Sequence, residues 1–171
     1  RPPKRFGCFC NFPRFQQMKP LFLITSALNP SYGVFSLFDR HNQTKNTIKS
    51  IREKVPEAAI FLVDVSVNGL PPHIQSDIIS SVDYFMSLNN HPGMMQLSNS
   101  GPGAKSPSEA LMTLLFLETV KERGLDKEYD RIFKITGRLE LDDGFDISAY
   151  ENLQDKYVFK KRVPTWMPTP Y

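Results

Sequence analysis

Cysteine is scarce in this chain, and it has no apolar run of membrane-spanning length. The 171 residues include two cysteines, Cys8 and Cys10. Their spacing is too short for an ordinary disulfide, and two ligands are too few for zinc. We therefore expect free thiols in a reducing compartment and a cytoplasmic location. Apolar runs such as Leu21 to Ile24 and Ala58 to Val63 are far below the roughly 20 residues that cross a bilayer, so we expect no membrane span.

Several sequence motifs are missing as well. The chain has no GxGxxG, no Gly-rich loop ending in Gly-Lys-Ser/Thr and no GxSxG, which disfavours dinucleotide oxidoreductases, P-loop enzymes and α/β hydrolases. Its three histidines lie far apart without the spacing of zinc ligands. The formal net charge is only +3, and the aromatic residues do not interleave with a basic stripe. We therefore expect no nucleic-acid partner.

Alternating apolar runs and amphipathic segments predict the fold. Hydrophobic residues make up 40% of the chain and charged residues 23%, a balance that suits a domain with a buried core. The expected strands are 21–26, 59–63, 82–88 and 131–136. Helical patterns lie between them, around Ile48 to Val55, from Pro71 to Ile79 and from Ser108 to Arg123. Such alternation predicts a three-layer α/β/α sandwich with a mostly parallel central sheet.

Two stretches break this alternation. Residues 1–17 are rich in proline and basic side chains and predict an irregular segment ahead of one α/β domain over 18–171. The stretch Asn89 to Pro107 contains three glycines, three prolines and three serines, which predicts a long loop that is mobile without ligand.

Ligands of parallel sheets bind beyond the carboxyl ends of the strands, where several polar side chains are expected. Thr25 and Ser26 end the first strand. Asp64 and Ser66 follow the second, where Asp64 could accept hydrogen bonds from a nucleotide or instead from nearby backbone amides. Lys105 precedes the best helix, where an ammonium and the helix dipole together favour phosphate. A surface lysine before a capping box of Ser106 and Glu109 is the alternative.

Charged residues cluster around the fourth strand. Arg138 follows Gly137 and offers a forked, permanent donor for phosphate. Asp142 and Asp143 could hold a divalent cation, manganese or magnesium, although adjacent carboxylates before a glycine also occur without metal. Glu140 is a candidate catalytic base that could equally face solvent.

Arg40 lies just before the first expected helix. It could contact phosphate or the acceptor, or it could be a solvated helix end.

Two segments resemble a known family. The strand ending Ile24-Thr-Ser26, the helical pattern from Arg40 and the strand Ile60-Phe-Leu-Val-Asp64 resemble the nucleotide-binding half of GT-A-type glycosyltransferases. Residues 129–138, with Lys-Ile-Thr-Gly-Arg at their end, look like the Lys-Ile-Ser-Gly-Arg segment of viral and bacterial capsular or lipopolysaccharide-type transferases. The resemblance implies a nucleotide-sugar donor, a glycan or other hydroxyl acceptor, and a role in polysaccharide biosynthesis.

The resemblance also implies roles for single residues. It places Asp64 at nucleotide recognition, Lys105 at the loop before the third helix, and residues 136–138 where other members carry the metal motif. Together with the strand-end argument, this assigns nucleotide-sugar binding to Thr25, Ser26, Arg40, Asp64, Ser66 and Lys105, catalysis to Arg138 and Glu140, and the metal to Asp142 and Asp143. The family's Asp-x-Asp motif is replaced by Thr-Gly-Arg, and the chain is short for the family, so truncation at its carboxyl end is expected. A non-catalytic binding or assembly module that keeps the transferase fold is the alternative.

Overall fold

The computed structural model describes residues 18–30, 33–101, 103, 105–153, 156 and 158. The expected irregular segment 1–17, with both cysteines, lies outside these residues, as does most of the chain after 153.

Four parallel strands form the centre of the structure, in the order β3-β2-β1-β4. The expected parallel α/β architecture is confirmed. The strands are β1 (Pro20–Ser26), β2 (Ala59–Asp64), β3 (Tyr84–Ser87) and β4 (Arg131–Thr136). Both β1 and β2 are buried along their whole length, which explains why their sequences are continuous apolar runs rather than alternating ones.

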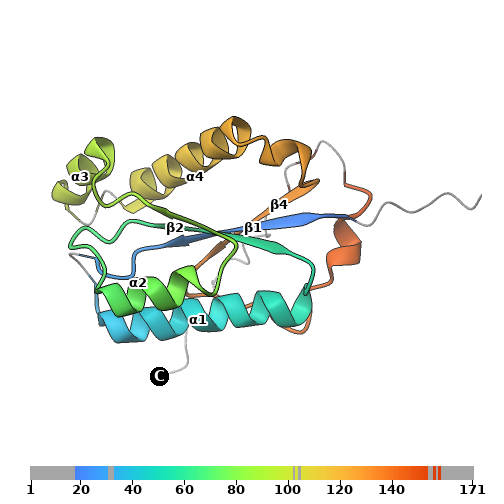
Figure 1. Ribbon diagram of the computed structural model, residues 1–171, viewed down its shortest axis with the longest axis horizontal. Coiled ribbons are helices and arrows are strands. Elements are labelled where there is room, and N and C mark those ends of the chain that lie inside the picture. The colour runs from blue at the N-terminus through green and yellow to red at the C-terminus, as the bar shows by residue number, and fades with distance from the viewer. Residues whose placement is uncertain are drawn as a thin grey trace, which may run out of the picture.

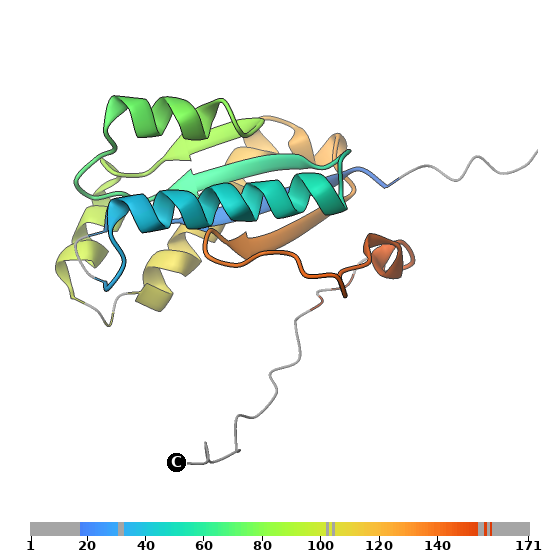
Figure 2. The same ribbon diagram turned by 90° about the horizontal axis from the view of Figure 1, so that it is seen from below.

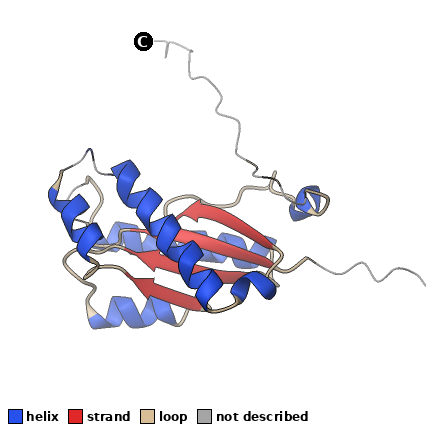
Figure 3. Ribbon diagram, turned by 90° about the horizontal axis from the view of Figure 1, so that it is seen from above, coloured by secondary structure: helices blue, strands red, loops and turns tan. Residues whose placement is uncertain are grey.

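Helices cover both faces of the sheet (Figure 1). On one face lie α1 (Leu37–Lys54) and α2 (Pro72–Ile79), and on the other α3 (Pro92–Asn99) and α4 (Lys105–Glu122). Two short 3-10 helices, Leu125–Lys127 and Ile147–Tyr150, complete the described elements. Figure 3 shows that α4 crosses the sheet on the face opposite to α1 and α2.

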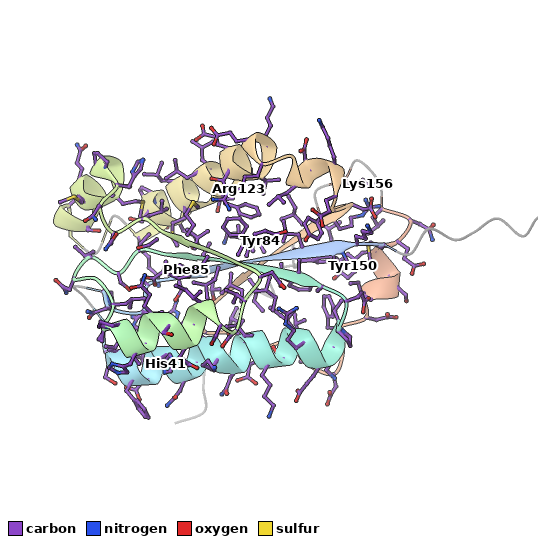
Figure 4. All side chains as sticks on the ribbon, viewed as in Figure 1. His41, Tyr84, Phe85, Arg123, Tyr150 and Lys156 are labelled. Atoms are coloured by element: carbon purple, nitrogen blue, oxygen red, sulfur yellow. The ribbon has the colours of Figure 1, made fainter. Side chains whose placement is uncertain are left out.

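Each layer of helices has its own core. Ile48, Ile51 and Ile78 pack with Phe22 on the α1 side, whereas Phe116 packs with other core residues on the α4 side. Alternate residues of one strand serve the two cores because successive side chains of a strand point to opposite faces. Tyr84 joins the α4 side and Phe85 the α1 side, and Figure 4 shows both on β3.

The register brings the carboxyl ends of the central strands to one edge. Ser26 pairs with Asp64 across β1 and β2, and Thr25 pairs with Thr136 across β1 and β4. From β1 the chain moves to β2 and β3 on one side, and then returns to place β4 on the other side. The strand order therefore reverses between β1 and β4, and such a reversal opens a crevice between the loops that leave the two strands.

The expected loop Asn89 to Pro107 is wrong over most of its length. Helix α3 occupies Pro92–Asn99, and α4 begins at Lys105. The ring of His91 accepts the amide of Met94 at 3.4 Å, and proline suits the first turn of a helix. Met94 is 2% exposed and belongs to the core. The glycines and serines around it in the sequence predict a loop although this residue is buried.

Helix α1 also begins earlier than expected. The side chain of Ser36 accepts the amide of Asp39, whose carboxylate accepts the amide of Ser36 in return. This reciprocal cap starts the helix at Leu37. Arg40 is therefore part of the first turn of α1 and not of the loop before it.

Candidate functional site

A cavity of about 480 Å³ opens where the strand order reverses. We call it the strand-end pocket. Its volume is typical of small-molecule sites. Small and hydroxyl-bearing residues, apolar side chains and three cationic side chains contribute to its lining. Among them are Thr25, Ser26, Thr44, Thr136 and Gly137; Val34, Phe35, Val65, Val67, Leu97 and Met112; and Arg40, Lys105 and Arg138.

The floor of the pocket depends on the absence of a side chain at Gly137. The hydroxyl of Thr44 donates to the carbonyl oxygen of Gly137 at 3.1 Å and lies 3.5 Å from the hydroxyl of Ser26. A Cβ at position 137 would lie 2.8 Å from the Thr44 hydroxyl oxygen and 3.3 Å from that of Ser26. Glycine is therefore required for β1, β4 and α1 to approach one another this closely.

Arg40 enters the pocket from the first turn of α1. Its guanidinium donates to the carbonyl oxygen of Ala27 at 3.1 Å. Burial, and secondly the charge of Arg138, lower the pKa of Arg40. The Nε atom of Arg40 is shielded from solvent and has no acceptor among the described residues. Arg40 and Arg138 thus place two positive charges at one cavity. Neither is paired with a carboxylate in the described part of the chain. Such an arrangement favours an anionic ligand.

Lys105 is the third cation and begins α4. The amide dipoles of this 18-residue helix place positive partial charge at the same end. Glu109 lies one turn further along and also lines the pocket. The carboxylate of Glu109 pairs with the ammonium of Lys134 from β4 and therefore does not neutralise the three cations that line the pocket.

Asp64 lies outside the pocket lining. Its side chain is fully buried, and its two carboxylate oxygens accept the amides of Leu28 and Ser66, each at 2.9 Å. Burial raises the pKa of Asp64, opposed by hydrogen bonds from Ser66 and the amide of Leu28. The hydroxyl oxygen of Ser66 accepts the amide of Asn29 at 2.8 Å. Asp64 and Ser66 thus bind backbone amides of the two loops. This is the alternative that the sequence pattern left open for Asp64. The nucleotide-binding role of both residues stays a prediction.

The acidic residues after β4 also lie away from the pocket. The chain turns back along α1 (Figure 2), where the amide of Leu141 donates to the hydroxyl of Ser50 at 3.0 Å and Lys54 pairs with Asp143 at 2.5 Å. Thr44 and Lys54 are ten residues apart on one helix, or about 15 Å. Asp143 is thus far from the pocket floor.

These carboxylates do not fit a cation bound at the pocket. Asp143 is held by Lys54, which lowers the pKa of the Asp143 carboxyl, and Asp142 accepts the amide of Gly144. Among the described residues, no group of three or more His, Cys, Asp or Glu side chains could hold a metal. Glu140 is exposed and does not line the pocket. Its catalytic role and the metal site both stay predictions.

The structure thus brings together five of the ten predicted site residues: Thr25, Ser26, Arg40, Lys105 and Arg138. Sequence reasoning missed Thr44 and assigned Glu109 to a helix cap. Thr44 carries a weak signal, since it lies one turn after Arg40 on the same helix and so shares its face. The apolar wall carries no such signal, because Val34, Phe35 and Leu97 come from loop and helix segments distant in sequence.

Comparison with known proteins does not assign the chain to a family. No family model, curated protein or solved structure gave a significant match to the chain. None of the described helices is long and apolar enough to span a membrane.

Proposed function

We propose that the chain is a glycosyltransferase of GT-A type that binds the nucleoside diphosphate of a nucleotide-sugar donor in the strand-end pocket. The observation that carries this proposal is the convergence of Arg40, Lys105 and Arg138, from three separate elements, on one cavity. Guanidinium groups bind phosphate oxygens in a forked geometry, and a lysine adds a point charge. A diphosphate is an anion of the size and charge that such a set would hold.

The remainder of the pocket suits the rest of a nucleotide. The side chains of Val34, Phe35 and Leu97 offer apolar surface against which a base can pack. Hydroxyl groups of Thr25 and Thr136 offer partners for ribose or sugar hydroxyls. In the proposed reaction the three cations stabilise the charge that develops on the departing diphosphate.

Calorimetric titration of the chain with UDP, GDP, CDP and ADP tests the proposal, with uridine and guanosine as controls that lack phosphate. We expect at least one diphosphate to bind, its parent nucleoside to bind far more weakly, and affinity to fall as salt rises. EDTA should leave the affinity unchanged, because the cations of the protein itself hold the diphosphate. A chain that binds none of the four diphosphates contradicts the proposal and favours the non-catalytic module.

A pair of arginine variants locates the bound phosphate. Arg138→Ala should weaken diphosphate binding by about 10- to 100-fold, the worth of a lost charge-assisted hydrogen bond. Arg123→Ala removes an exposed arginine at the far end of α4 and should leave binding unchanged. Equal affinities in the two variants would show that the phosphates bind elsewhere.

A further inference from the structure

Glu109 has a position that its helix-capping pattern does not explain. Among the described residues that line the strand-end pocket, it is the one carboxylate, and the lining there includes no histidine, cysteine or tyrosine. The pocket's cations cannot take up a proton while charged. Glu109 is therefore the described side chain at the pocket best suited to act as a general base.

Glu109 also lines a second, shallow groove on the outer side of the same helix. The register explains why this groove exists. Ile132 and Lys134 of β4 pair with Leu21 and Leu23, which are buried in the α4-side core. Yet Ile132 is 44% exposed, because α4 packs over β1 and β2 and leaves β4 uncovered on this face.

The groove between α4 and β4 has both apolar and polar walls. Leu114 and Leu117 give it apolar surface, and Ser106 and Thr113 give it hydroxyl groups. Lys134 also lines the groove, and Glu109 lines both the groove and the pocket. The ion pair of Lys134 with Glu109 fixes the carboxylate at the junction of the two cavities. An occupant of this groove would reach the pocket at Glu109.

We infer that this groove holds the sugar acceptor and that Glu109 removes the proton from the attacking hydroxyl group. The inference rests on the proposed function. A sugar ring presents carbon-bound hydrogens on its faces and hydroxyl groups on its rim, which matches leucine surface bordered by hydroxyl side chains. Lys134 is a positioning residue that orients the carboxylate.

In the proposed transfer, one bond to the anomeric carbon of the donor sugar forms as another breaks. The acceptor oxygen forms a bond to the anomeric carbon of the donor sugar as the bond from that carbon to the diphosphate oxygen breaks. The electron pair of the broken bond leaves with the diphosphate, next to Arg40, Lys105 and Arg138. The proton of the acceptor hydroxyl passes to the carboxylate of Glu109, and solvent later removes it.

Turnover of the full chain tests the assignment, measured as release of UDP or GDP from UDP-glucose, UDP-galactose, UDP-N-acetylglucosamine and GDP-mannose. Water and p-nitrophenyl glucoside or galactoside serve as acceptor probes. Glu109→Gln should lower kcat by about 100-fold or more while the affinity for the diphosphate stays within twofold. The matched control Glu118→Gln, an exposed glutamate on the same helix, should keep wild-type values.

Two further readouts separate catalysis from a structural role. Lys134→Met breaks the same ion pair but should lose less than tenfold in kcat. Leu114→Gln, in the groove wall, should raise KM for the p-nitrophenyl glycoside without changing the affinity for the diphosphate.

Each contrary result has a distinct meaning. A Glu109→Gln variant with kcat within threefold of the wild type overturns the assignment, as do equal losses in Glu109→Gln and Lys134→Met. A wild-type chain that binds diphosphate but releases none from any donor also overturns it and leaves the binding proposal standing. If no diphosphate binds at all, the proposed function fails, and this inference fails with it.

Discussion

The two junctions on either side of β1 lie at the same edge of the sheet but differ in what their polar groups bind. Between β1 and β2, the carboxylate of Asp64 accepts two backbone amides, and the hydroxyl of Ser66 accepts a third. We call this the closed junction. Between β1 and β4, the strand-end pocket places Arg40 and Arg138 at a cavity without a paired carboxylate among the described residues. We call this the open junction.

The difference follows from the course of the chain. The loops after β1 and β2 run side by side, so their amides meet a buried acceptor that must be satisfied from within the protein. Between β1 and β4 the chain changes face: α1 follows β1 on one face of the sheet, whereas α3 and α4 precede β4 on the other, and such a reversal leaves a crevice at the strand ends. A polar residue at a strand end therefore supports a ligand site only where the neighbouring loops separate.

Removal of the Asp64 carboxylate should have the largest effect on stability. Asp64→Ala leaves the buried amides of Leu28 and Ser66 without their acceptor, which costs about 2–5 kcal/mol of unfolding free energy. Asp64→Asn keeps one acceptor oxygen and should cost less. Urea unfolding followed by circular dichroism measures both. A loss below about 1 kcal/mol in Asp64→Ala would mean that the closed junction is not held by this residue.

A side chain at Gly137 should damage the open junction while the closed one stays intact. The added Cβ of Gly137→Ala would press on the hydroxyls of Thr44 and Ser26, which costs about 1–3 kcal/mol of unfolding free energy and weakens diphosphate binding. Gly103→Ala is the matched control, because a Cβ there meets none of the described residues within 4 Å. Unchanged stability and binding in Gly137→Ala would show that the close approach is not needed.

The smallest expected effect comes from a surface cluster remote from the closed junction. Asp77 on α2 accepts Lys45 at 3.0 Å and pairs with His41 at 2.7 Å. Figure 4 shows His41 on α1. The side chain of Asp77 is 42% exposed, so Asp77→Asn should cost only about 0.5–1 kcal/mol of unfolding free energy. Asp126→Asn, an exposed aspartate away from α1, is the control.

The pH dependence of this cluster has a definite sign. The hydrogen bond from Lys45, and secondly that from His41, lower the pKa of Asp77 in the folded state. The contribution of Asp77 to stability is therefore complete above the pKa of an unfolded aspartate, near about 4, and is lost as the pH falls through the lower, folded-state value. Wild type and Asp77→Asn should converge in stability at low pH, and a gap that widens there would contradict this.

Local sequence was sufficient for the strands and insufficient for the site. The run Arg131–Thr136 forms a strand with the predicted bounds, because its pattern and flanks leave few alternatives. The role of Asp64 depends on which loop amides approach it from 36 residues away in the chain. Glu109 fits a capping pattern locally, and only the placement of β4 beside α4 reveals its partner Lys134. Pairings of this kind are set by topology, which periodicity does not encode.

Amide chemical shifts of the ¹⁵N-labelled chain, titrated with the tightest-binding of UDP, GDP, CDP and ADP, test the difference between the two junctions most directly. At saturation, the amides of Ser26, Gly137 and Arg138 at the open junction should shift, whereas those of Leu28 and Ser66 at the closed junction should stay in place. Shifts at Leu28 and Ser66 without any at Gly137, or no shifts at all, would contradict the assignment of the ligand site to the open junction.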